Sequence, residues 1–307
     1  MLSIKHLKKA DNCNIGLMCI KNYILVLKKE NISVVFEDIG IWNVLTVLMI
    51  IFVVYLLVYP QLQVRGIKAR RLRVIKKLEK SQGTKVLTMV HRKEALSLFG
   101  VPVYQYIDSD DAEQIIKGIR ETGKRPIDLI IHTPGGQMHS SIQIARALKK
   151  HSEHTRVIIP YYSMSGGTII ALAADEILMD PDAVIGPIDP QIGDFIRGTY
   201  PAPSWIYAAN KKGMNAEDST IIMSDISQKA MNLTGAIAHE LLSDRFEDQN
   251  KLKVATDKLF SGELIHITPI QASEAIELGL PVKTEIPGEV YEFMNCFRYV
   301  KTSVEYL

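Results

Sequence analysis

The 307-residue sequence has little cysteine and almost no excess of charge. Its three cysteines lack metal-ligand spacing and are too few for a disulfide framework, which fits a reducing compartment. The net charge of +2 lacks the basic surplus typical of nucleic-acid-binding proteins. No phosphate-binding or dinucleotide-binding glycine motif occurs, and the acidic residues Asp180, Asp189 and Asp194 lack a histidine partner for a metal. We therefore expect no cofactor, no metal and no nucleic-acid partner.

One stretch contains no charged residue at all. Residues 41–59 read IWNVLTVLMIIFVVYLLVY, and at about 1.5 Å per residue such a run just crosses a hydrocarbon core of roughly 30 Å. Trp42 and Tyr59 suit the interfacial zones of a bilayer. A buried core helix is the alternative, but such helices rarely go so long without a charge. The run also lacks the small-residue cleavage site of a signal peptide. The sequence therefore predicts a transmembrane helix at 41–59.

The flanks of this run predict its orientation. Seven lysines and arginines lie between Arg65 and Lys77, whereas Glu37 and Asp38 precede the run. The positive-inside rule then predicts a single-pass protein of the cell membrane with its C-terminal bulk in the cytoplasm. The tail at 1–40 is also basic and receives no function. Residues 60–82 are expected to form a basic juxtamembrane linker, as a helix on the membrane surface or a stalk.

The remainder alternates apolar strands with amphipathic helices. Strands are predicted at 86–90, 127–131 and 157–159, and helices follow Ser109, the turn at 132–136 and Ser165. Continuous apolar strands separated by helices indicate a sheet buried on both faces, as in βαβ units. The predicted class is α/β, with the main domain at 83–286 and a C-terminal tail at 287–307.

Two glycine turns follow successive predicted strands. The first is Pro134-Gly135-Gly136, and the second is Ser165-Gly166-Gly167. Paired glycines expose backbone N–H groups that can stabilise an oxyanion. A serine between a strand and a helix presents its hydroxyl beside the N–H groups of the helix start. Each turn alone has an ordinary explanation, a plain turn or an N-cap serine. Together they supply the nucleophile and the donors for acyl transfer.

Long parts of the chain resemble the serine dehydrogenase proteinase family, membrane-anchored relatives of signal peptide peptidase A and the Clp protease proteolytic subunit. The resemblance covers roughly residues 42–285 and rests on the motifs at 91–120, 127–136, 161–193 and 261–282. It implies the Clp protease/crotonase-like fold, serine peptidase activity on peptide or protein substrates, and ring-like homo-oligomers.

The resemblance also assigns roles to residues of the two turns. Ser165 matches the nucleophile, with Ser163 as the fallback, and the N–H groups of Gly136 and Gly166 match the oxyanion hole. Beside them, the substrate is expected to contact Pro134, Gly135 and Gly167.

The general base is harder to assign. The Clp protease subunit uses a histidine after its nucleophile helix, but residues 183–193 contain none, which favours the Ser/Lys dyad of the signal peptide peptidase relatives. A lysine serves only if burial lowers its pKa. Lys229 is the first candidate, because it falls at the edge of a predicted buried stripe formed by Ile222, Ile226, Leu233 and Ile237. Snorkelling to solvent is the alternative.

Two further residues remain candidates for the base. Lys212 is second, because in related peptidases the lysine precedes this helix. His266 is third, since relatives often carry an acid after that histidine, and Ile267 in this chain weakens a His/Asp pairing.

The leading functional hypothesis is a serine endopeptidase that cleaves membrane-proximal or small cytoplasmic polypeptides. The alternatives are a catalytically silent membrane scaffold of the same fold and crotonase-type acyl-CoA chemistry. The latter needs an oxyanion hole but no nucleophilic serine.

Overall fold

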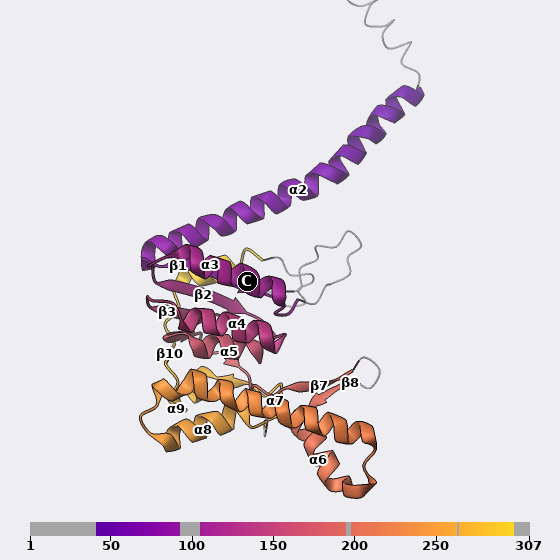
Figure 1. The fold of residues 1–307 in the computed structure, drawn as a ribbon. Helices are drawn as coiled ribbons and strands as arrows, with labels where there is room; N and C mark the ends of the chain where they lie inside the picture. Colours follow the sequence, from indigo (N-terminus) through magenta and orange to yellow (C-terminus); the bar gives the residue numbers. More distant parts are fainter. Residues whose placement is uncertain (1–40, 93–104, 195–197, 263, 298–307) are drawn as a thin grey trace, which may run out of the picture. The chain divides into compact units, whose positions relative to one another are not determined.

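A computed structural model describes residues 41–92, 105–194, 198–262 and 264–297 (Figure 1). The predicted N-terminal tail at 1–40 and the end of the predicted C-terminal tail, 298–307, lie outside these ranges, as does part of the family motif at 91–120. The chain divides into two compact units, Met1–Gly66 and Ile67–Leu307.

Helix α2 (Ile41–Gln82) confirms that residues 60–82 are helical. Its apolar side chains from Val44 to Tyr59 are all exposed. Within the described ranges, however, no helix combines the length and apolar character needed to cross a membrane. The transmembrane helix predicted at 41–59 is therefore not supported.

A five-stranded parallel sheet forms the centre of the second unit, which confirms the predicted α/β class. Its order is β1-β2-β3-β5-β10. The strands are β1 (Lys85–Val90), β2 (Ile127–His132), β3 (Thr155–Ile159), β5 (Glu176–Met179) and β10 (Val282–Lys283). All six residues of β2 are buried, as a near-continuous apolar strand covered on both faces requires.

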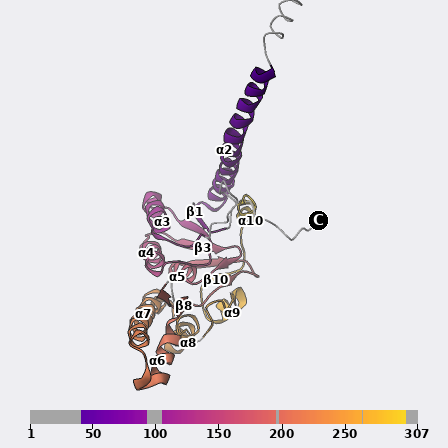
Figure 2. The same ribbon diagram turned by 90° about the vertical axis from the view of Figure 1, so that its right-hand side faces the viewer.

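Helices cover both faces of this sheet. Helices α3 (Ser109–Thr122), α4 (Met138–Lys149) and α5 (Gly166–Ala173) lie on one face, and α10 (Gly288–Met294) lies on the other (Figure 2). Successive strand residues point to opposite faces. Leu129 and Ile131 accordingly belong to the larger core cluster, whereas Ile130 packs in the smaller cluster with Leu78 of α2 and Phe293 of α10.

Shorter elements extend from the carboxyl ends of β3 and β5. A three-stranded sheet has the order β4-β6-β9 and consists of β4 (Tyr162–Ser163), β6 (Val184–Ile185) and β9 (Ile270–Gln271). A two-stranded ribbon, β7 (Gln191–Asp194) and β8 (Gly198–Pro201), leads into the remaining helices. These helices are α6 (Ala202–Lys212), α7 (Asp218–Leu242), α8 (Gln249–Phe260) and α9 (Ala272–Glu277).

The apolar stripe predicted for α7 is largely wrong. Ile222, Ile226 and Leu233 are 58%, 41% and 49% exposed. Of the predicted stripe, only Ile237 is buried, and the buried face otherwise carries small and polar residues towards the start of the helix. That face comprises Thr220, Ser227, Thr234, Ile237, Ala238, Leu241 and Leu242.

Candidate active site

The two glycine turns meet because their strands are neighbours. Strands β2 and β3 pair in parallel, so their carboxyl ends lie at the same edge of the sheet. The chain segments beyond them continue the pairing. The N–H of Thr133 donates to the carbonyl of Tyr162 over 3.2 Å, and the N–H of Met164 donates to the carbonyl of Thr133 over 3.0 Å. This pairing fixes the second turn beside the first.

Ser165 has a strained backbone. Its φ of 49° is the only positive φ at a non-glycine residue in the described ranges, and its ψ is −113°. Such a conformation costs on the order of 1–3 kcal/mol and persists only where the surrounding structure imposes it. Ser165 occupies the N-cap position of α5, yet its side chain caps no helix N–H. The ordinary N-cap explanation for this serine therefore does not apply.

Gly135 and Gly166 allow the two turns to touch. Gly135 has a φ of +104°, and a Cβ built on it would lie 2.9 Å from Ser165 Cβ and 2.9 Å from the Met164 oxygen. A Cβ on Gly166 would lie 3.5 Å from the Gly136 nitrogen and only 2.3 Å from Ser141 Oγ. Real Cβ atoms essentially never lie within 3.0 Å of a non-bonded heavy atom. The close approach of the turns therefore requires glycine at position 135, whereas a Cβ on Gly166 would displace Ser141.

Most backbone N–H groups around Ser165 already donate hydrogen bonds within the described chain, and those of Gly136 and Gly166 are exceptions. Gly167 donates to Met164, and Thr168 donates to Ser165. Among the turn, loop and cap hydrogen bonds of the described chain, none has the N–H of Gly136 or Gly166 as its donor to a backbone carbonyl. Gly166 is the first residue of α5, where an N–H has no partner within its helix. Both predicted oxyanion donors therefore belong to the touching turns, one from each.

A chain of polar side chains holds the first turn, and its members His91 and Asp111 were not predicted from the sequence. The Asp111 carboxylate lies 3.2 Å from His91 Nε2, and His91 Nδ1 lies 2.7 Å from Thr133 Oγ1. Thr133 Oγ1 accepts from the N–H of Gly135 over 3.2 Å. Burial opposes ionisation of Asp111, but hydrogen bonds from His91 and Asp108 hold the pKa of its carboxyl below the usual range.

His132 is a different kind of histidine. Its ring lies 4.1 Å from that of Tyr162, and its Nδ1 is buried without a hydrogen-bond partner among the described residues. Burial, followed by the positive charges of Arg92 and His91, lowers the pKa of His132 to about 3. The residue is therefore a neutral packing group beneath the first turn.

The remaining residues of the turns fall into two groups. Ser163, the fallback nucleophile, has a fully buried Oγ without a partner in the described chain, so a substrate has no access to it. A Cβ on Gly167 would lie 2.4 Å from that Oγ, so Gly167 faces the interior rather than a substrate. Pro134 and Gly136 are exposed.

Neither candidate lysine has the burial that a lysine base requires. The Lys229 side chain is 73% exposed, and its Nζ pairs with Asp225 one helical turn away. The predicted placement of Lys229 at the edge of a buried stripe is therefore wrong. Lys212 is exposed at the last residue of α6. Within the described chain, neither residue makes a hydrogen bond or ion pair with the glycine turns.

The third candidate has the acidic partner that the sequence analysis did not find. His266 Nδ1 contacts the carboxylate of Asp189, which lies 77 residues earlier in the chain. The Asp189 side chain is 1% exposed and that of His266 is 30% exposed. No short motif links the two residues, so the sequence held no signal for this pair.

Comparison with known proteins identifies relatives along most of the chain. Residues 37–307 match the model of a family described as ClpP-like SDH-type serine proteinases. The uncharacterized proteins MJ0137 and MJ1495 of Methanocaldococcus jannaschii are each 46% identical to this chain. The first match covers 80% of this chain and 84% of the relative, and the second covers 84% and 87%.

A solved structure shows a weaker likeness. It is a mutant of the 1510-N membrane-bound stomatin-specific protease, 19% identical, with a TM-score of 0.41 over 62% of this chain and 79% of that one.

Proposed function

Because the chain belongs to the ClpP-like SDH-type serine proteinase family, we propose that it is an endopeptidase whose nucleophile is Ser165. The observation that carries this proposal is the contact between two glycine turns at a strained serine. A hydroxyl held at a forced backbone angle and engaged in no capping bond is available to a substrate. A serine that only capped α5 would have the unstrained, extended backbone that is usual at an N-cap.

The proposed reaction uses the groups of the two turns. Ser165 Oγ attacks the carbonyl carbon of a peptide bond, and the carbonyl electron pair moves onto oxygen. The N–H groups of Gly136 and Gly166 are the proposed donors to that oxyanion. Loss of the amine leaves an acyl group on Ser165, and water releases it. The helix dipole of α5 favours negative charge at the same point.

The exposed first turn suggests how a substrate lies. Pro134 and Gly136 are exposed while Gly135 is buried against Ser165. An extended peptide that pairs with this segment would place its carbonyl above the hydroxyl, the mode of β-augmentation. This proposal includes Pro134 and Gly135 as substrate contacts and leaves out Gly167, whose surroundings are interior side chains.

A fluorophosphonate probe tests the proposed nucleophile directly. The purified full chain should form a covalent adduct with the probe, and mass spectrometry should place it on Ser165. Ser165→Ala should abolish labelling, whereas Ser152→Ala, at an exposed serine, should leave it unchanged. No labelling of the folded wild-type chain, or labelling that survives in Ser165→Ala, would contradict the proposal. It would favour the catalytically silent scaffold instead.

Attachment to the cell membrane, with the catalytic domain in the cytoplasm, is part of the same proposal. Its support is the charge-free run at 41–59, the basic residues that follow it, and the exposed apolar side chains of Val44–Tyr59. The full chain should sediment with membranes and remain there at high salt. A chain that begins at residue 67 should be soluble. Recovery of the full chain in the soluble fraction would contradict membrane attachment.

Assembly into homo-oligomers is also proposed. Ile222, Ile226 and Leu233 expose an apolar face on α7, and such a face is typical of contacts between subunits. Ile226→Lys together with Leu233→Lys should reduce the molar mass found by light scattering. An unchanged mass in the folded double variant would contradict this interface.

A further inference from the structure

We infer that His266, oriented by Asp189, is the general base that activates Ser165. This inference rests on the proposed peptidase function and names a catalytic residue for it. In this inference His266 takes the role of general base that the sequence analysis gave to a lysine of the same protomer. Three observations support it: the register of the small sheet, the contacts between its loops, and the hydrogen bonds of the buried carboxylate.

The register places the three residues beyond the same end of the β4-β6-β9 sheet. Ser163 pairs in parallel with Ile185, and Ile185 pairs antiparallel with Ile270. Ser165 lies two residues past this row along β4, and Asp189 lies four residues past it along β6. Because β9 runs in the opposite direction, His266 lies four residues before Ile270 at the same end.

Direct contacts tie the β6 loop to the serine turn. Thr168 Oγ1 lies 2.9 Å from the carbonyl oxygen of Ser163 and 2.9 Å from that of Gly186, and its hydroxyl can donate to either. A Cβ on Gly186 would lie 2.5 Å from the methyl carbon of Met164, the residue before the nucleophile. The segment that leads to Asp189 is therefore packed against the segment that ends in Ser165.

The Asp189 carboxylate is buried and fully engaged. Its side chain is 1% exposed, one oxygen contacts His266 Nδ1, and the other accepts from Gln191 Nε2 over 2.6 Å. A buried carboxylate is costly unless hydrogen bonds and a charge partner compensate it. A backbone turn alone does not require such a group. Its presence is explained if the imidazole beside it becomes positively charged during a reaction.

The contact also fixes the tautomer of His266. A carboxylate only accepts, so Nδ1 must carry the proton that it donates to Asp189. In the neutral form of the ring the lone pair is then on Nε2, which makes no hydrogen bond within the described chain. The His266 side chain is 30% exposed, so part of the ring is accessible from solvent. This is the arrangement that a general base needs when a third group orients it.

The proton transfers balance over the whole reaction. Nε2 takes the proton of Ser165 Oγ as the O–C bond forms, and the imidazolium is stabilised by Asp189. Nε2 then returns that proton to the departing amine as the C–N bond breaks. In the second half, Nε2 takes a proton from the attacking water and returns it to Ser165 Oγ when the acyl group leaves as a carboxylic acid. No external oxidant or reductant is required.

The test compares labelling kinetics of the folded full chain with a fluorophosphonate probe. His266→Gln keeps an amide donor for Asp189 but removes the base, and it should lower the maximal labelling rate by about 100- to 10,000-fold. Asp189→Asn should lower that rate by at least about tenfold while the probe concentration for half-maximal rate stays unchanged. Imidazole added to His266→Ala should restore part of the rate.

Matched variants separate this inference from its premise. His239→Gln, at an exposed histidine of α7, should label like the wild type, as should Lys229→Ala and Lys212→Ala. If the wild type labels at Ser165 but His266→Gln labels equally fast, the inference is overturned while the peptidase proposal stands. A large loss in Lys229→Ala or Lys212→Ala overturns it in favour of a lysine. If the wild type does not label at all, the proposed function itself fails.

Discussion

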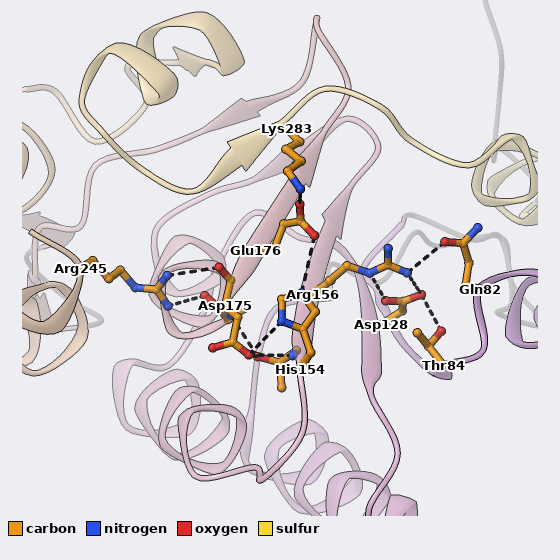
Figure 3. A network of polar contacts seen from close by, with 11 residues as sticks. Gln82, Thr84, Asp128, His154, Arg156, Asp175, Glu176, Arg245 and Lys283 are labelled. Atoms are coloured by element: carbon orange, nitrogen blue, oxygen red, sulfur yellow. Dashed lines mark hydrogen bonds and ion pairs between the residues drawn. The ribbon is translucent and has the colours of Figure 1, made fainter.

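The two ends of the central sheet use polar groups in opposite ways. At the amino ends of the strands, the buried Asp128 of β2 accepts from the Arg156 guanidinium of β3 over 2.7 and 2.8 Å. Thr84 Oγ1 donates to the same carboxylate over 2.7 Å (Figure 3). The network continues across the sheet, where Glu176 of β5 pairs with Lys283 of β10.

At the carboxyl ends, by contrast, polar groups are left available. The hydroxyl of Ser165 caps no helix, and the amides of Gly136 and Gly166 make no loop hydrogen bond in the described chain. The backbone there is also strained. One end of the sheet satisfies its charges and contributes rigidity. The other end leaves two backbone N–H groups and a serine hydroxyl without these partners, which is the arrangement that the proposed function requires.

The largest expected effect is on stability, at the amino-terminal end. Arg156→Met should leave the Asp128 carboxylate buried without its charge partner, because the Asp128 side chain is 0% exposed. The free energy of unfolding should fall by about 3–5 kcal/mol, as measured by urea denaturation. The rate of fluorophosphonate labelling per folded molecule should be unchanged, since the network lies away from the glycine turns.

An exposed ion pair provides the control. Lys117→Met breaks the pair with Glu121, in which both side chains are more than two-thirds exposed, and it should change the free energy of unfolding by less than about 1 kcal/mol. Equal losses in both variants would remove the distinction between the ends of the sheet.

The next effect is on activity, at the carboxyl-terminal end. Gly135→Ala places a methyl group 2.9 Å from Ser165 Cβ and requires an alanine at φ +104°. The two turns must then separate, and the labelling rate should fall by about 100- to 1,000-fold, the loss typical of a displaced oxyanion donor. The readout is the rate of adduct formation on protein that retains its circular dichroism spectrum.

Gly235→Ala is the matched control. A Cβ at this exposed position of α7 meets nothing within 4 Å. Because alanine is the better helix former, the free energy of unfolding should rise by roughly 0.5–1 kcal/mol, with no change in labelling. A labelling rate for Gly135→Ala equal to that of Gly235→Ala would show that the contact between the turns does not matter.

The smallest effect concerns the packing beneath the first turn. The pKa of His132 is about 3 in the folded chain, below the value near 6.5 of an unfolded histidine. Between these values the unfolded state binds more protons, so stability should fall as pH decreases from about 6.5 towards 3. The contribution is at most about 1.4 kcal/mol per pH unit.

His132→Leu should flatten this part of the stability profile, measured by urea denaturation at pH 4 to 7. His151→Gln, at a partly exposed histidine, serves as the comparison, since this ring contacts only a backbone carbonyl among the described groups. An identical slope in His132→Leu and the wild type would show that His132 does not cause the pH dependence.

Local patterns were sufficient for the strands and the two turns. The apolar runs at 127–131 and 157–159 form adjacent strands. They could be predicted because a strand that is buried on both faces has a nearly continuous apolar sequence. The helix predicted after Ser165 also formed, as α5. Glycine pairs after such strands pointed correctly to the edge of the sheet where the turns touch.

Long-range packing decided what the sequence left open. Periodicity on α7 suggested burial for Lys229, but the face towards the core was the one with small and polar residues. Similarly, α10 supplies Phe293 to the sheet although it lies in the predicted tail.

The sequence by itself determined the α/β class, the order of strands and turns, and the serine between a strand and a helix. Only the tertiary structure decided which histidine has a buried acidic partner. Asp189 and His266 are far apart in the chain, and they meet because β6 and β9 pair antiparallel. Pairing between distant strands depends on the whole core rather than on local sequence.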